Sequence, residues 1–111
     1  MGHQGLGEFE HFVLLAILHL GKDVYGVPVT EEIMRRTGRR VSRTAVYVTL
    51  RRLEKKGLVS TWMGDPTPER GGKARRYMKL EPAGLDALRE SRTAMDEMWR
   101  GAELPLEGSS P

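Results

Sequence analysis

The chain has 111 residues, 39% of them hydrophobic, with no cysteine and a net charge of +3 at pH 7. This length fits one domain with a modest core, and the absence of cysteine excludes disulfides and thiol chemistry. No apolar run reaches the roughly 18 residues of a membrane span, and the start lacks a basic, apolar signal sequence. We therefore expect a cytoplasmic protein with no membrane partner.

The charge is distributed unevenly along the sequence. Residues 35–57 hold nine Lys or Arg against one acid, and residues 58–79 hold five against two. The flanking residues 1–34 and 80–111 each carry a net charge of −4. A basic middle of +11 between acidic flanks is typical of a phosphate-binding face, so the sequence predicts a polyanionic partner.

The first predicted element is a helix from Glu8 to Leu20, which Gly21 is expected to end. A helix that is apolar on most sides is usually buried on most sides. This helix is therefore either a central core helix or lies between the core and a second chain. Its apolar positions are Phe9, Phe12, Val13, Leu14, Leu15, Ala16, Ile17, Leu18 and Leu20.

A second helix is predicted from Pro28 to Thr37, with Val29 and Ile33 facing inward and Gly38 at its end. A third follows within a few residues and is strongly basic on its outer face. Two short helices in this arrangement predict a helix-turn-helix.

The third helix is predicted from Ser42 to Lys56, because Ser42 can cap its first turn and Gly57 can adopt the left-handed conformation past its last. Its inward stripe is Val46, Leu50 and Leu53. Its outer face mixes basic residues with an aromatic ring, as a helix in the DNA major groove requires, although a solvated charged face has the same pattern. The outer residues are Thr44, Tyr47, Val48, Arg51, Arg52 and Lys55.

A β-hairpin is predicted next, with strands over residues 58–63 and 73–80 and a Gly/Pro-rich loop between them. Met78 and Leu80 should face one side and Tyr77 and Lys79 the other, and Trp62 is expected in the core. A basic hairpin directly after a recognition helix is a wing; the alternative is a plain surface hairpin. The basic residues near its tip are Arg70, Lys73, Arg75 and Arg76.

The last predicted helix runs from Pro82 to Arg100, with an apolar stripe of Leu85, Leu88, Met95 and Trp99. It is too long for so small a domain to cover, so part of this stripe needs a partner. Met95 and Trp99 are candidates for stacking an aromatic ligand in a dimer pocket, or for packing across the dimer. We thus expect a DNA-binding domain over residues 1–81, a dimerisation helix over residues 82–100, and a disordered tail over residues 101–111.

Enzyme motifs are absent from the sequence. There is no P-loop, no dinucleotide-binding fingerprint and no nucleophile with an obvious base. His3, His11 and His19 do not have the spacing of a metal site. We expect neither an enzyme nor a bound cofactor or metal.

Several strings resemble the PadR family of bacterial transcriptional regulators, over about residues 8 to 90. The combination is specific, although each string alone is weak. The strings are Leu14-Leu15-Ala16-Ile17-Leu18, Tyr25-Gly26, the run from Ala45 to Val59, Pro68-Glu69-Arg70-Gly71-Gly72, Arg76-Tyr77 and Leu80-Glu81-Pro82-Ala83-Gly84.

The resemblance implies a mainly α fold with a β-hairpin wing, a winged helix-turn-helix followed by a C-terminal dimerisation helix. It implies a homodimeric repressor, with the first and last helices forming the dimer and a small molecule or other signal releasing the DNA. Two departures from the family are Met78, where a second tyrosine is common, and Glu81, where a threonine is common. The short last helix fits the compact branch of the family, so an effector would bind between subunits or beside the winged domain.

The predicted partner is double-stranded DNA with an inverted-repeat operator. Arg43, Thr44, Tyr47 and Arg51 are the candidates for base edges or nearby phosphates, beside the capping Ser42. Two rival functions stay open, a winged-helix module that binds protein and a drug-binding protein that sequesters its ligand. The candidates for phosphate contacts are Arg52, Lys55, Arg70, Lys73, Arg75 and Arg76.

Overall fold

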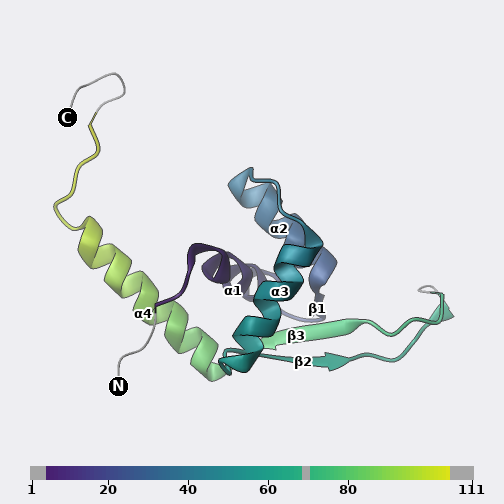
Figure 1. The fold of residues 1–111 in the computed structure, drawn as a ribbon. Coiled ribbons are helices and arrows are strands. Elements are labelled where there is room, and N and C mark those ends of the chain that lie inside the picture. The colour runs from purple at the N-terminus through teal and green to yellow at the C-terminus, as the bar shows by residue number, and fades with distance from the viewer. Residues whose placement is uncertain (1–4, 69–70, 106–111) are drawn as a thin grey trace.

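The computed structural model describes residues 5–68 and 71–105. Three helices pack together, a hairpin extends to one side of them, and a long helix leaves from the other side (Figure 1). This is the mainly α, winged helix-turn-helix architecture that the sequence predicts. The elements are α1 (Glu8–Leu20), β1 (Val24–Tyr25), α2 (Gly26–Thr37), α3 (Arg43–Lys55), β2 (Val59–Met63), β3 (Arg76–Leu80) and α4 (Pro82–Trp99).

Both ends of α3 are held as its sequence predicts. The Ser42 hydroxyl accepts a hydrogen bond from the Ala45 backbone N–H at 3.0 Å, which satisfies one of the free donors of the first turn. Past the last turn Gly57 adopts a φ of 75°, and the Leu58 N–H donates to the Leu53 carbonyl at 3.0 Å. The chain therefore leaves α3 directly into β2.

The core lies where α1, α2 and α3 meet the sheet. On α1, Val13, Leu14 and Ile17 are buried, whereas Leu15 is 38% and Leu18 is 49% exposed. One face of α1 thus lies in the core, and its opposite apolar face is uncovered in the single chain. The buried apolar residues are Val13, Leu14, Ala16, Ile17, Val24, Val29, Ile33, Val46, Leu50, Leu53, Val59, Met78 and Leu88.

The sheet has three antiparallel strands in the order β1-β3-β2. The sequence did not predict β1, because a strand of two residues has no recognisable alternation. It pairs Tyr25 with Tyr77 and Val24 with Met78. The returning strand begins at Arg76, so the expectation of a strand from Lys73 was three residues too long at its start.

The expectation that Trp62 lies in the core was wrong. Thr61 pairs with the buried Met78, so alternation turns its neighbour Trp62 to the outer face of the sheet. There Trp62 is 44% exposed and stacks on Tyr77, with ring centroids 6.0 Å apart. The indole therefore shields another aromatic ring on the outside of the wing.

The start of α4 packs closely against Leu58, in the segment between α3 and β2, and the rest of α4 is largely uncovered. A Cβ on Gly84 would lie 2.2 Å from the Leu58 carbonyl oxygen, so only glycine allows this approach. After the buried Leu88, the apolar residues Met95, Met98 and Trp99 are 54%, 79% and 51% exposed. Within the described ranges, no helix is long and apolar enough to cross a lipid bilayer.

Candidate nucleic-acid interface

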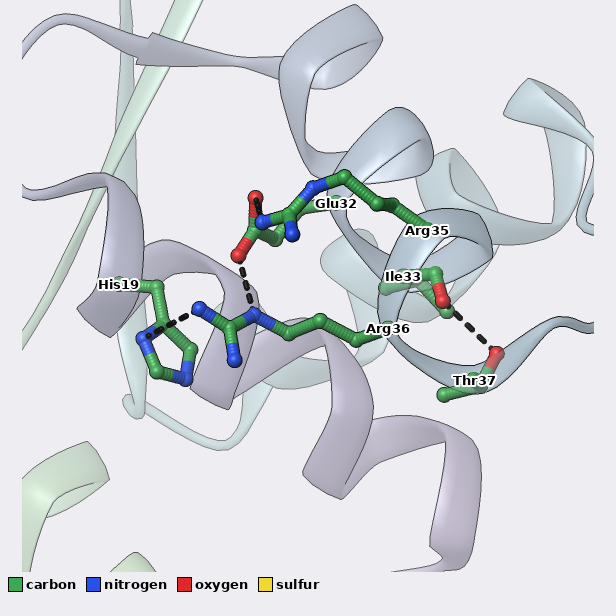
Figure 2. A network of polar contacts seen from close by, with 6 residues as sticks. All are labelled: His19, Glu32, Ile33, Arg35, Arg36 and Thr37. Carbon is green, nitrogen blue, oxygen red and sulfur yellow. Dashed lines mark hydrogen bonds and ion pairs between the residues drawn. The ribbon is translucent and has the colours of Figure 1, made fainter.

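The basic residues of α2 are paired with an acid on the same helix. Glu32, whose side chain is only 10% exposed, accepts a hydrogen bond from Arg35 at 2.8 Å and another from Arg36. Arg36 also lies 3.3 Å from Nδ1 of His19 on α1 (Figure 2). The hydrogen bonds from Arg36 and then Arg35 lower the pKa of Glu32 to about 2 from its ordinary value of 4.5. Arg36 therefore links α2 to α1.

Replacing Glu32 with glutamine is expected to lower the free energy of unfolding at neutral pH. A carboxylate whose pKa is lower in the folded state stabilises the fold above its unfolded pKa, and this stability is lost as the pH falls toward the folded value. The difference between wild type and Glu32→Gln should therefore be full at pH 7 and shrink between about pH 4.5 and 2. Urea unfolding across this range measures it, with Glu31→Gln, an exposed neighbour, as control. If the difference in unfolding free energy between wild type and Glu32→Gln did not change with pH, the lowered pKa of Glu32 would be contradicted.

Two further cations are paired with acids of α1. Arg39 donates to Glu8 at 2.5 Å, and the hydrogen bond and the charge of Arg39 lower the pKa of Glu8. Lys56 donates to the buried Glu10 at 2.8 Å. Burial raises the pKa of Glu10, but hydrogen bonds from Lys56 and the Gly7 N–H, with the nearby positive charges, outweigh it and lower the pKa.

The cations of α3 itself have a different environment. Arg43, Arg51, Arg52 and Lys55 are exposed, and none forms an ion pair with an acid among residues 5–68 and 71–105. The same holds for Arg40 in the turn before α3, which is not among the candidates predicted from the sequence. The sequence feature that could have identified Arg40 is the Arg39-Arg40 pair shortly before the capping Ser42. The fold thus pairs the cations of α2, Arg39 and Lys56 with acids, and it leaves the cations on the outer face of α3 without such a pair. Among the α3 cations, Arg52 is close enough to Glu10 for its charge to lower the pKa of that carboxyl.

The outer face of α3 also presents side chains suited to base edges. Tyr47 is 44% and Val48 is 50% exposed, and the Arg51 guanidinium lies 6.0 Å from the Tyr47 ring centroid. Arginine can donate to guanine and an apolar side chain can contact a thymine methyl group, which are the contacts of a major-groove helix. A groove of about 470 Å³ runs beside this face. Its lining includes Tyr25, Arg43, Thr44, Tyr47, Arg75 and Arg76.

The predicted wing residues that the structure describes differ in their contacts. Arg75 packs over the Tyr25 ring at 3.8 Å, whereas Arg76 donates to the Thr61 hydroxyl at 2.9 Å beside α3. Lys73 is exposed in the loop between β2 and β3, and Arg70 lies outside the described residues. The wing therefore holds Arg75 and Arg76 against neighbouring side chains.

The predicted ligand residues lie far from this face. Met95 and Trp99 are exposed on α4, and this helix leaves the helical core on the side opposite the wing (Figure 1). The described part of the chain brings together no group of three His, Cys, Asp or Glu side chains that could hold a metal ion. An exposed basic recognition helix beside a hairpin is the feature that defines winged helix-turn-helix DNA-binding proteins.

The chain belongs to the PadR-like family of transcriptional regulators, whose family model matches residues 14–90. It is 41% identical over 90 residues to the transcriptional regulator Rv3488 of Mycobacterium tuberculosis, covering 79% of each chain. A PadR-like transcriptional regulator from Bacillus cereus has a similar structure, with a TM-score of 0.69, 22% identity, and coverage of 91% of this chain and 93% of that one. A PadR family regulator from Eggerthella lenta gives a TM-score of 0.66 at 25% identity, covering 85% and 81% of the two chains. The protein is accordingly a transcriptional regulator and not an enzyme.

Proposed function

We propose that the protein is a dimeric repressor that binds an inverted-repeat operator and is released by a small molecule or another signal. The observation that carries this proposal is the sorting of the basic residues: those of α2 are paired with acids, and those on the outer face of α3 are not. A surface that served only for solubility would not require this separation. In a family of transcriptional regulators, duplex DNA is the anion that fits it.

In this proposal α3 enters the major groove and the wing contacts the phosphate backbone. Arg43, Thr44, Tyr47 and Arg51 contact base edges or the phosphates beside them, and Ser42 holds the first turn in place. The backbone contacts come from Arg52, Lys55, Arg70, Lys73, Arg75 and Arg76. The contacts of Arg75 with Tyr25 and of Arg76 with Thr61 would have to rearrange before these two arginines could contact a phosphate.

The dimer is proposed to form through the uncovered apolar surfaces of α1 and α4. These helices contact each other, and Leu15, Leu18, Met95, Met98 and Trp99 remain exposed in the single chain. Residues 1–81 would then form the DNA-binding unit and residues 82–100 the dimerisation helix. Of the proposed disordered tail, residues 106–111 lie outside the described residues. A cytoplasmic location agrees with this function.

An effector is proposed to bind at the same dimer interface. Met95 and Trp99 are the residues that could hold an aromatic compound there, since a thioether and an indole pack well against aromatic rings. A ligand that fits only one arrangement of the two subunits would change the spacing of the two α3 helices. That change would weaken operator binding.

Operator binding is expected to weaken steeply as salt is added. Each phosphate neutralised by Lys or Arg contributes about −0.9 to the slope of log K against log salt. The two α3 cations proposed to contact phosphate, Arg52 and Lys55, alone give a dimer a slope of about −3.6, and the proposed wing contacts make the slope steeper. Fluorescence anisotropy with a labelled promoter duplex measures this slope. The salt is varied between roughly 50 and 300 mM, where the effect of salt on affinity is large. A slope near zero would contradict the proposal, and tryptophan quenching by aromatic compounds without any DNA binding would favour a ligand-sequestering protein.

A further inference from the structure

The outer face of α3 carries one acid that does not fit a DNA-binding surface. Glu54 is the only acid in residues 35–57, and it is exposed. It lies in the last turn of α3, where the helix dipole disfavours a negative charge, and near the side chains proposed to contact DNA. Its charge repels phosphate. Its presence therefore calls for a structural role that offsets these two costs.

Glu54 is the end of a chain of hydrogen bonds that joins the wing to α3. The Thr61 hydroxyl on β2 donates to the Glu54 carboxylate at 2.7 Å. The same hydroxyl accepts a hydrogen bond from Nη1 of Arg76 on β3 at 2.9 Å. A hydroxyl can donate one hydrogen bond and accept another, so both contacts are satisfied together. We name Glu54, Thr61 and Arg76 the wing tether.

The wing tether stands between the helix and the hairpin at the DNA-facing side. It borders a cavity of about 290 Å³ that Tyr47 and Arg51 also line. Hydrogen bonds to charged groups are stronger than neutral ones, and here one end is a carboxylate and the other a guanidinium. The tether thus fixes the base of the hairpin against the same helix face that presents Arg51.

We propose that Glu54 is a positioning residue for operator selection, acting through Thr61 and Arg76. This proposal rests on the proposed function. The tether holds the wing at one angle to α3. The wing cations can then contact phosphates only when the α3 side chains also contact their bases. A wing without the tether would meet phosphates in any register. Operator binding would then lose its advantage over binding to random DNA.

Three substitutions separate this role from a simple charge effect. Glu54→Ala removes the negative charge and the acceptor oxygen, whereas Glu54→Gln removes the same charge and keeps an acceptor oxygen. Thr61→Val removes the middle of the tether without changing any charge. Both Glu54 and Thr61 lie outside the buried core, so the variants should fold.

The assay compares the Kd for a duplex selected by the wild-type protein from a random pool with the Kd for random-sequence duplex of equal length. Loss of the negative charge should strengthen binding to random DNA by a similar factor, about 2- to 5-fold, in both Glu54 variants. Preference for the selected duplex should fall about 10-fold in Glu54→Ala and Thr61→Val, and much less in Glu54→Gln. Glu31→Gln, an exposed acid on α2, is the control for charge outside the tether.

A second measurement follows the wing directly. Trp62 lies next to Thr61 on β2, so in a Trp99→Phe background its fluorescence anisotropy decay reports hairpin motion. We expect faster motion in Glu54→Ala and Thr61→Val than in Glu54→Gln. Unchanged operator preference in Glu54→Ala, or equal losses in Glu54→Ala and Glu54→Gln, would overturn the tether proposal. If the wild-type protein selected no sequence at all, the proposed function itself would fail.

Discussion

Replacing both Met95 and Trp99 with glutamate is expected to separate the proposed dimer into monomers and to weaken operator binding by about 100-fold or more. These side chains are 54% and 51% exposed in the single chain, so the substitutions leave the core intact. In a dimer they would place four new charges in an apolar interface, which is strongly unfavourable. Linking two half-site contacts in one molecule raises affinity by about 10²- to 10⁴-fold, and a monomer loses that gain.

Sedimentation velocity and anisotropy with operator DNA measure the two effects. The wild type should sediment at twice the chain mass of 12.5 kDa, and the double variant at that mass. Met63→Glu is a matched control, because Met63 is 53% exposed but lies on the wing. It should remain dimeric. A wild-type protein that is monomeric at micromolar concentration would contradict the dimer, and a double variant that stays dimeric would place the interface elsewhere.

Much of the fold could be predicted because it follows from local rules. Ser42 and Gly57 mark the ends of α3 through backbone groups only a few residues away, and the structure confirms both. The spacing of Val46, Leu50 and Leu53 gives the buried stripe of α3 directly. Consequently the outer face of α3, which is the candidate interface, could also be predicted from the sequence.

The parts that could not be predicted depend on contacts between distant residues. β1 exists because Val24 and Tyr25 pair with a strand more than 50 residues later in the chain. Trp62 faces outward because the register with β3 places Thr61 inward, and a sequence pattern of five residues does not fix that register. Such positions are decided by tertiary packing, which overrides local preference.

The pairing of charges was also hidden in the sequence. The block of nine basic residues in 35–57 looks uniform, yet Arg39 pairs with Glu8 and Lys56 pairs with Glu10, 31 and 46 residues away. The sequence therefore predicted a basic surface but not which of its cations are available. For the same reason the sequence does not reveal the hydrogen bond between Thr61 and Glu54.

Arg51→Ala and Lys73→Ala are expected to have different effects on DNA binding. Arg51 lies on the outer face of α3, where its guanidinium can donate two hydrogen bonds to a guanine. Its loss should cost about 1–3 kcal/mol, or about 5- to 150-fold in Kd, and relax the preference at one base pair of each half-site. Lys73 is exposed on the loop of the wing, where we propose that it contacts phosphate. Its loss should weaken operator and random DNA about equally and reduce the salt slope by about 1 per subunit.

Arg35→Ala is the matched control for Arg51→Ala, because Arg35 is exposed but paired with Glu32 on α2. It should change operator binding little.

Two recognition helices related by a two-fold axis should protect two half-sites about one helical turn apart, since both dock on one face of the duplex. Footprinting and selection from a random pool, each with wild type and variants, measure these effects. If Lys73→Ala altered base preference and Arg51→Ala did not, the wing would select the sequence and α3 would anchor the protein, the reverse of the proposed roles.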